Sequence, residues 1–197
     1  MKHLSLIAVF IGLCSSSLMG AQTGLRDIRM DEVQAAFRQP LSPHPRLLMT
    51  DTQLDEVQIG LKSDPALQTL QRAILEKADG IIPQEPVKRI QTGRRLLSVS
   101  RNCLDRVLHL STAYRLTQER KYLERAEAEM LAAASFTDWN PSHFLDVAEM
   151  TAALAIGYDW LYRDLPESSR ATIRQAILDK GIKPSLKNTG WVRGHNN

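Results

Sequence analysis

The sequence predicts an all-α fold, and two observations carry this prediction. After residue 50, apolar side chains recur every three or four positions along most of the chain, which is the spacing of one helix face. No run shows the strict apolar–polar alternation of a strand that is buried on one side. Because short segments with Pro or Gly separate the helical runs, we expect the helices to pack as antiparallel pairs.

Start and stop signals locate the individual helices. Thr50 or Asp51 can cap the first helix with a side-chain oxygen, and Pro65 lies near the start of the second. The last helix begins at Pro166 and is expected to stop at Gly181, a common pair of boundary residues. The helical runs predicted in this way are 50–64, 64–81, 94–117, 121–136, 141–162 and 166–181.

The run 141–162 differs from the others because it is apolar on all sides. Asn140 is a good N-cap, and Pro141 suits the first helical position. Between Glu149 and Asp159 the run contains no charged residue. Since a helix that is apolar all round is buried on more than one side, we expect this one inside the helical assembly, with partners on several faces.

The N-terminal residues are typical of a secretory signal peptide, which we assign to residues 1–21. A short basic start precedes the apolar run 4–13, which is too short to span a bilayer. The protein is therefore expected to be exported, periplasmic or secreted, with no membrane attachment after cleavage. A polar leader is assigned to residues 22–43 and a helical domain to residues 44–197.

The net charge of the protein narrows the range of binding partners. The net charge is +3 and the pI is about 9.0, which suits an acidic polymer as partner, although a basic surface kept for solubility explains it equally well. No run of Lys and Arg suggests binding to nucleic acid.

Once the signal peptide is removed, Cys103 is the remaining cysteine and is expected to be a small buried hydrophobe. No metal-ligand spacing occurs, so we expect neither metal nor cofactor.

Polar residues gather around the start of the apolar run. Trp139, Asn140 and His143 could line a sugar-binding cleft, because an indole offers an apolar face and the other two can bond hydroxyls. Arg101 is a further candidate for contact with anionic groups on a substrate. The alternative is structural: Asn140 caps the helix, His143 is a satisfied core histidine and the arginines lie on a solvated face.

Two carboxylates on the same run allow another interpretation. Asp146 and Glu149 are three residues apart and therefore share a helix face. Paired carboxylates are used in glycoside hydrolysis by an acid and a base, so a hydrolase remains an alternative. Placement on one helix is a weak signal for that chemistry, and Asp146 also suits the helix dipole near the N-terminus.

The last residues combine types that serve in catalysis. Trp191 is followed by His195, Asn196 and Asn197. β-Elimination from a uronic acid needs neutral donors that stabilise the enolate-like charge next to C5, together with a base that removes the C5 proton. Asn and His can supply such donors. A loop that follows a helix, with asparagines in turns, explains the same residues without any chemistry.

Three segments together resemble one known family. "HPRLLMTDTQL", "KYLERAEAEMLAAASFTDWNPSHFLDVAEMTAALAIGYDWLY" and "WVRGHNN" are similar to the N-terminal region of heparinase II-like polysaccharide lyases, from the heparinase II/III family. The resemblance implies an incomplete (α/α) toroid, which in the family precedes antiparallel β-sheet domains. It also implies β-elimination of a uronic-acid-containing, glycosaminoglycan-like polysaccharide of the heparin or heparan sulfate type.

The resemblance also assigns roles to residues. His195, Asn196 and Asn197 match positions that neutralise the uronate carboxylate. Apart from the resemblance, Trp191 is also expected to bind substrate. The family's catalytic Tyr, a further His and the zinc site of its β-domain have no counterpart here, so no metal is claimed. We therefore expect residues 44–197 to be a partial, truncated lyase domain with little or no activity alone. The main alternative is a non-catalytic helical domain that binds acidic polysaccharide.

Overall fold

The computed structural model describes residues 31, 35 and 41–187. The chain divides into two units after Leu41, and every helix discussed below belongs to the second unit, Ser42–Asn197. Within residues 41–187 the regular structure is helical, apart from an isolated antiparallel bridge between Thr92 and Arg95, and no strand occurs there. The predicted all-α class is confirmed for this part of the chain.

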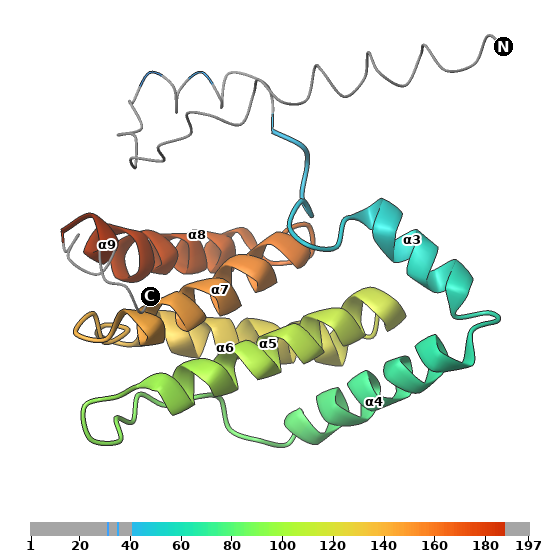
Figure 1. The fold of residues 1–197 in the computed structure, drawn as a ribbon, viewed down its shortest axis with the longest axis horizontal. Helices are drawn as coiled ribbons and strands as arrows, with labels where there is room; N and C mark the ends of the chain where they lie inside the picture. Colours follow the sequence, from blue (N-terminus) through green and yellow to red (C-terminus); the bar gives the residue numbers. More distant parts are fainter. Residues whose placement is uncertain (1–30, 32–34, 36–40, 188–197) are drawn as a thin grey trace, which may run out of the picture. The chain divides into compact units, whose positions relative to one another are not determined.

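The helices follow one another with short connections, apart from the longer segment 82–96 between α4 and α5 (Figure 1). In chain order they are α3 (Asp51–Gly60), α4 (Pro65–Ile81), α5 (Leu97–Thr117), α6 (Arg120–Ser135), α7 (Phe144–Trp160), α8 (Glu167–Ala176), the π-helix η1 (Ile177–Ile182) and α9 (Lys183–Lys187).

Local signals fix the starts of the first two helices. The Thr50 side chain accepts a hydrogen bond from the Gln53 amide, and the Gln53 side chain bonds back to the Thr50 backbone, which is a complete capping box. Asp64 caps α4 by accepting from the Ala66 amide, and Pro65 occupies the first turn. Of the two predicted caps, Thr50 and Asp51, Thr50 is the one observed, and the predicted position of Pro65 is confirmed.

Helices α5 and α7 lie side by side and run in the same direction (Figure 1). At one end, the amide of Leu96, just before α5, donates to Asp146 in the first turn of α7. At the other end, the guanidinium of Arg115 near the end of α5 lies 5.6 Å from the ring centroid of Trp160, the last residue of α7. Both helices therefore have their N-termini at the same end of the unit.

Helix α7 is packed on several faces, as its apolar sequence predicts. It contacts α5, α6, α8 and η1, and Met150, Ala153 and Leu154 are completely buried. Other fully buried side chains of the same core come from α5 and α6: Cys103, Val107, Leu110, Leu123, Ala126 and Met130. Cys103 is thus a buried hydrophobe, as predicted. No helix among the described residues is long and apolar enough to cross a bilayer.

Several predicted helix boundaries are wrong. Helix α3 ends at Gly60 rather than at residue 64, and α5 begins at Leu97 rather than at residue 94. Helix α7 begins at Phe144 rather than at Pro141, and Asn140 has a left-handed backbone (φ 60°) instead of an N-cap conformation. Gly181 does not end the last helix, because η1 runs through it into α9. A Cβ at Gly181 would lie 2.6 Å from Thr151 Oγ1, so this glycine permits close packing against α7.

Candidate functional site

A buried carboxylate organises the common end of α5 and α7. Asp146, completely buried in the first turn of α7, accepts hydrogen bonds from Arg95 Nε at 3.1 Å and Arg95 Nη2 at 2.8 Å. Its other oxygen accepts from the Leu96 amide at 2.7 Å and from Asn140 Nδ2 at 2.7 Å. Asn140 also donates to the Arg94 carbonyl. These bonds join the turn before α5 to the loop before α7.

The hydrogen bonds keep Asp146 ionised. Burial alone would raise the pKa of this carboxyl, but the donors Arg95, Asn140 and the Leu96 amide outweigh burial and hold the pKa below its ordinary value. The Asp146 carboxylate in turn raises the pKa of Arg95. A carboxyl that is buried, fully bonded and ionised is unsuited to act as a general acid, so the geometry does not favour the hydrolase alternative at Asp146.

A second ion pair lies one turn further along α7. Arg101 Nε donates to Glu149 Oε1 at 3.2 Å, with the Arg101 side chain 61% exposed and that of Glu149 18% exposed. No described residue bonds the two Nη nitrogens of Arg101, and the exposed Arg94 has no ion pair within residues 41–187. Arg94, Arg95 and Arg101, with Asp146 and Glu149, are referred to below as the arginine cluster.

The charges of the arginine cluster do not cancel. The cluster contains three guanidiniums and two carboxylates, which leaves one positive charge in excess. The excess charge is that of Arg94, whose side chain is exposed and whose carbonyl accepts from Asn140. The starts of two parallel helices also lie here, and helix N-termini carry partial positive charge. The cluster is therefore a favourable place for one anionic group.

The substrate-binding residues predicted around α7 have different environments. Trp139 is completely buried, and its Nε1 donates to the Ala133 carbonyl at 3.0 Å, so its ring belongs to the core and offers no open face to a sugar. Asn140 is 5% exposed and serves the Asp146 network. His143 is partly exposed at the N-cap position of α7, without a capping bond from its side chain. Among the predicted residues that the structure describes, Arg101 is the most exposed.

The remaining predicted residues cannot be placed. Trp191, His195, Asn196 and Asn197 lie outside the described residues.

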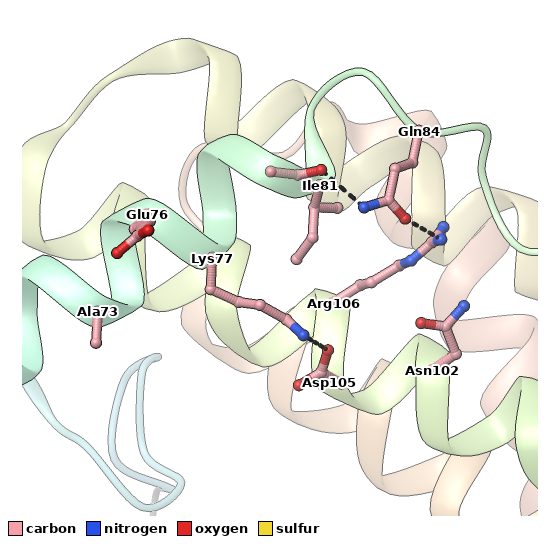
Figure 2. Close-up of a pocket in the computed structure, with 9 residues that line it drawn as sticks. Ala73, Glu76, Lys77, Ile81, Gln84, Asn102, Asp105 and Arg106 are labelled. Carbon is pink, nitrogen blue, oxygen red and sulfur yellow. Dashed lines mark hydrogen bonds and ion pairs between the residues drawn. The ribbon is translucent and has the colours of Figure 1, made fainter.

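A polar pocket lies between α4 and α5 (Figure 2). Its volume is about 390 Å³. Lys77 Nζ pairs with Asp105 at 3.0 Å across it, and Gln84 accepts from Arg106 Nη2 at 2.6 Å. A groove of about 420 Å³ on the residues that follow α4 shares Asn102 and Arg106 with this pocket. Positive and negative side chains are balanced here, in contrast to the arginine cluster.

Sequence analysis missed the residue that supports this pocket. Glu129 on α6 is completely buried, and it accepts from Arg106 at 2.6 Å, from Arg125 at 2.9 Å and from the Val87 amide at 2.9 Å. The available signal was its spacing, because Glu129 lies three and four residues from Ala126 and Ala133, on the apolar face of its helix. A charge on that face indicates a buried ion pair.

The described residues contain no group of three or more His, Cys, Asp or Glu side chains placed to hold a metal ion. Comparison with known proteins adds no assignment: no protein-family model matches the chain, and no curated protein matches it.

Proposed function

We propose that this chain is the helical part of an exported lyase that binds a uronic-acid-containing polysaccharide and cleaves it by β-elimination. The observation that carries the proposal is the arginine cluster, which has one excess positive charge and two open Nη groups on Arg101. Guanidinium groups bind planar carboxylates and sulfates by paired hydrogen bonds, and such groups recur along a glycosaminoglycan-like chain.

The packing of the helices supports the proposed incomplete (α/α) toroid. In such a fold, inner helices run parallel to one another and alternate along the chain with outer helices. Helices α5 and α7 are parallel neighbours, whereas α6, which lies between them in the sequence, packs against both. The arginine cluster is at the shared N-terminal end of the two proposed inner helices.

The proposed chemistry is removal of the C5 proton of a uronate. The electrons of the C5–H bond form a C4–C5 double bond, and the glycosidic oxygen on C4 leaves with a proton from an acid. His195, Asn196 and Asn197 are proposed to neutralise the carboxylate so that charge can develop next to C5. The resemblance assigns removal of the proton to a Tyr for which the matched segments offer no counterpart, so for residues 44–197 we propose binding of the polysaccharide.

The binding step is tested by affinity electrophoresis and calorimetry with heparan sulfate, chondroitin and neutral dextran. We expect retention by one or both acidic polymers, no retention by dextran, and weaker binding as salt increases. Arg101→Ala should weaken binding about tenfold, because a hydrogen-bonded charge contact is lost. Equal affinity for dextran would reject the proposal.

The cleavage step is tested on the product of the complete reading frame. A lyase releases unsaturated uronates that absorb in the ultraviolet, and His195→Ala should remove that signal. Binding without unsaturated products would favour the alternative, a non-catalytic domain that holds acidic polysaccharide. Saturated products would indicate a hydrolase.

A further inference from the structure

We infer that Glu149 is a positioning residue, which orients Arg101 so that its two Nη groups can bind one carboxylate or sulfate of the polysaccharide. The inference rests on the proposed function, because it names the contact by which the arginine cluster recognises its substrate. It assigns Glu149 a role in binding rather than in acid or base chemistry.

The geometry of the ion pair carries the inference. Glu149 bonds the Nε of Arg101, at 3.2 Å, and therefore occupies the inner side of the guanidinium. The described residues leave both Nη nitrogens without a hydrogen bond, and the Arg101 side chain is 61% exposed. Since the guanidinium is planar, a contact at Nε limits the orientation of the plane and directs the outer edge towards solvent.

Glu149 is partly buried and belongs to a rigid helix. Its side chain is 18% exposed, and its second oxygen, Oε2, is buried without a hydrogen-bond partner among the described residues. Helix α7 is packed on several faces, so the carboxylate that holds Arg101 projects from a rigid element. A long exposed side chain loses rotamer freedom when it binds a ligand, and a contact to a rigid neighbour removes part of that cost beforehand.

The charges near Glu149 fit a single anionic group. The charge of Glu149 also acts on Arg95: the pKa of Arg95 is raised first by its hydrogen bond with Asp146 and to a smaller extent by the charge of Glu149. With Asp146 opposing Arg95 and Glu149 opposing Arg101, Arg94 supplies the excess positive charge. An exposed ion pair contributes little to stability, so stability does not explain why Arg101 is held in this way.

Two substitutions of Glu149 distinguish positioning from simple charge. Glu149→Gln removes the negative charge but keeps an oxygen that can accept from Arg101 Nε, so it should tighten binding of an anion by about two- to threefold. Glu149→Ala removes the same charge together with the contact, and it should weaken binding by about fivefold despite the lost repulsion. If Glu149 acted by charge alone, both substitutions would tighten binding.

The experiment measures the dissociation constant of the full chain for a heparan sulfate hexasaccharide, and for its desulfated and carboxyl-reduced forms, by calorimetry. If Arg101 binds a sulfate, Glu149→Ala should no longer change the affinity for the desulfated form. If Arg101 binds a carboxylate, the same should hold for the carboxyl-reduced form. Glu124→Ala is the matched control, since Glu124 pairs with Arg120 on the exposed face of α6. The affinity of Glu124→Ala should equal that of the unaltered protein.

Each outcome decides a separate point. Weaker binding by Glu149→Ala, tighter binding by Glu149→Gln and unchanged melting temperatures would support the inference. Tighter binding by both variants, or no change in either, would overturn it while leaving the proposed function intact. Failure of the unaltered protein to bind any acidic form would overturn the proposed function itself, and the role of Glu149 with it.

Discussion

Asp146 and Arg95 are joined by two hydrogen bonds to one carboxylate oxygen, Oδ1, across 51 residues of sequence. The other oxygen accepts the Leu96 amide, so the same carboxylate fixes both a side chain and the backbone at the start of α5. Two more buried carboxylates act in a similar way. Glu129 accepts the Val87 amide, and Asp159 accepts the amides of Arg46 and Leu47 as well as a bond of 2.5 Å from His44 Nδ1.

Asp146→Ala should destabilise the protein by about 3 kcal/mol, because it leaves the Leu96 amide, Asn140 and the Arg95 guanidinium without their acceptor. Arg95 is 37% exposed and can recover hydration, which keeps the cost towards the lower end of the range for buried ion pairs. Urea unfolding followed by circular dichroism measures the change. Glu124→Ala, at an exposed pair, should lie within about 0.5 kcal/mol of the unaltered protein. A similar small change for Asp146→Ala would contradict the assigned role.

The same carboxylate predicts a dependence of stability on pH. Burial raises the pKa of Asp146, but its hydrogen bonds hold the folded-state pKa below the value of about 3.9 expected in the unfolded chain. Above about pH 5 the carboxyl is ionised in both states, and its full contribution to stability is present. As the pH falls through about 4 towards the folded-state pKa, the unfolded chain takes up the proton first, and the free energy of unfolding decreases.

Asp146→Asn isolates this contribution. The difference in unfolding free energy between the unaltered protein and Asp146→Asn should be constant between about pH 5 and 7, then shrink below about pH 4. Urea titrations at half-unit intervals of pH provide the measurement. A difference that does not change with pH would show that the ionised state of Asp146 is not favoured by folding.

Local signals in the sequence were sufficient for most of the helices. The capping box at Thr50 and the Pro at the start of α4 involve neighbours within a few residues, and both were predicted correctly. The predicted N-cap role of Asn140 is wrong because its side-chain amide donates to Asp146 and to the carbonyl of Arg94, which is 46 residues away in the sequence. The predicted helix end at Gly181 is wrong because this glycine allows close packing against Thr151. Rules for residues at helix ends do not consider such tertiary packing.

The candidate site was predictable only in part, for the same reason. The spacing of Asp146 and Glu149 showed that they share a helix face, but it could not reveal their partners. Asp146 pairs with Arg95, which lies just before α5, and Glu149 pairs with Arg101 on α5. Trp139 was predicted at a cleft from its polar neighbours, whereas its Nε1 bonds the Ala133 carbonyl inside the core. Partners that are distant in the sequence decide which polar residues remain open to solvent.

Two glycines on different helices should respond in opposite ways to alanine. A Cβ at Gly157 in α7 would lie 2.6 Å from both Val107 Cγ1 and Met130 Sδ, so Gly157→Ala should destabilise by about 2 kcal/mol through overpacking. Met130 can move, but the branched Val107 side chain has one preferred rotamer in a helix. Nothing lies within 4 Å of a Cβ at Gly80 in α4, so Gly80→Ala should stabilise by about 0.5–1 kcal/mol.

Thermal and urea unfolding of both glycine variants measure these changes in the free energy of unfolding. Destabilisation by Gly157→Ala beside stabilisation by Gly80→Ala would establish that α5, α6 and α7 are in close contact at Gly157. If Gly157→Ala were as stable as the unaltered protein, the helices would have to lie further apart than this packing requires.

Cys103 should be unreactive in the folded protein. Its thiol is completely buried in α5, and burial raises its pKa well above the ordinary range, so the reactive thiolate is absent at neutral pH. The sequence contains one other cysteine, Cys14, which Cys14→Ser removes. In that variant a disulfide reagent such as dithionitrobenzoate should label no thiol at pH 8, and should label one thiol per chain in urea. The labelling rate at intermediate urea concentrations then reports how often the core around α5 opens, and fast labelling without urea would show that Cys103 is accessible in the native state.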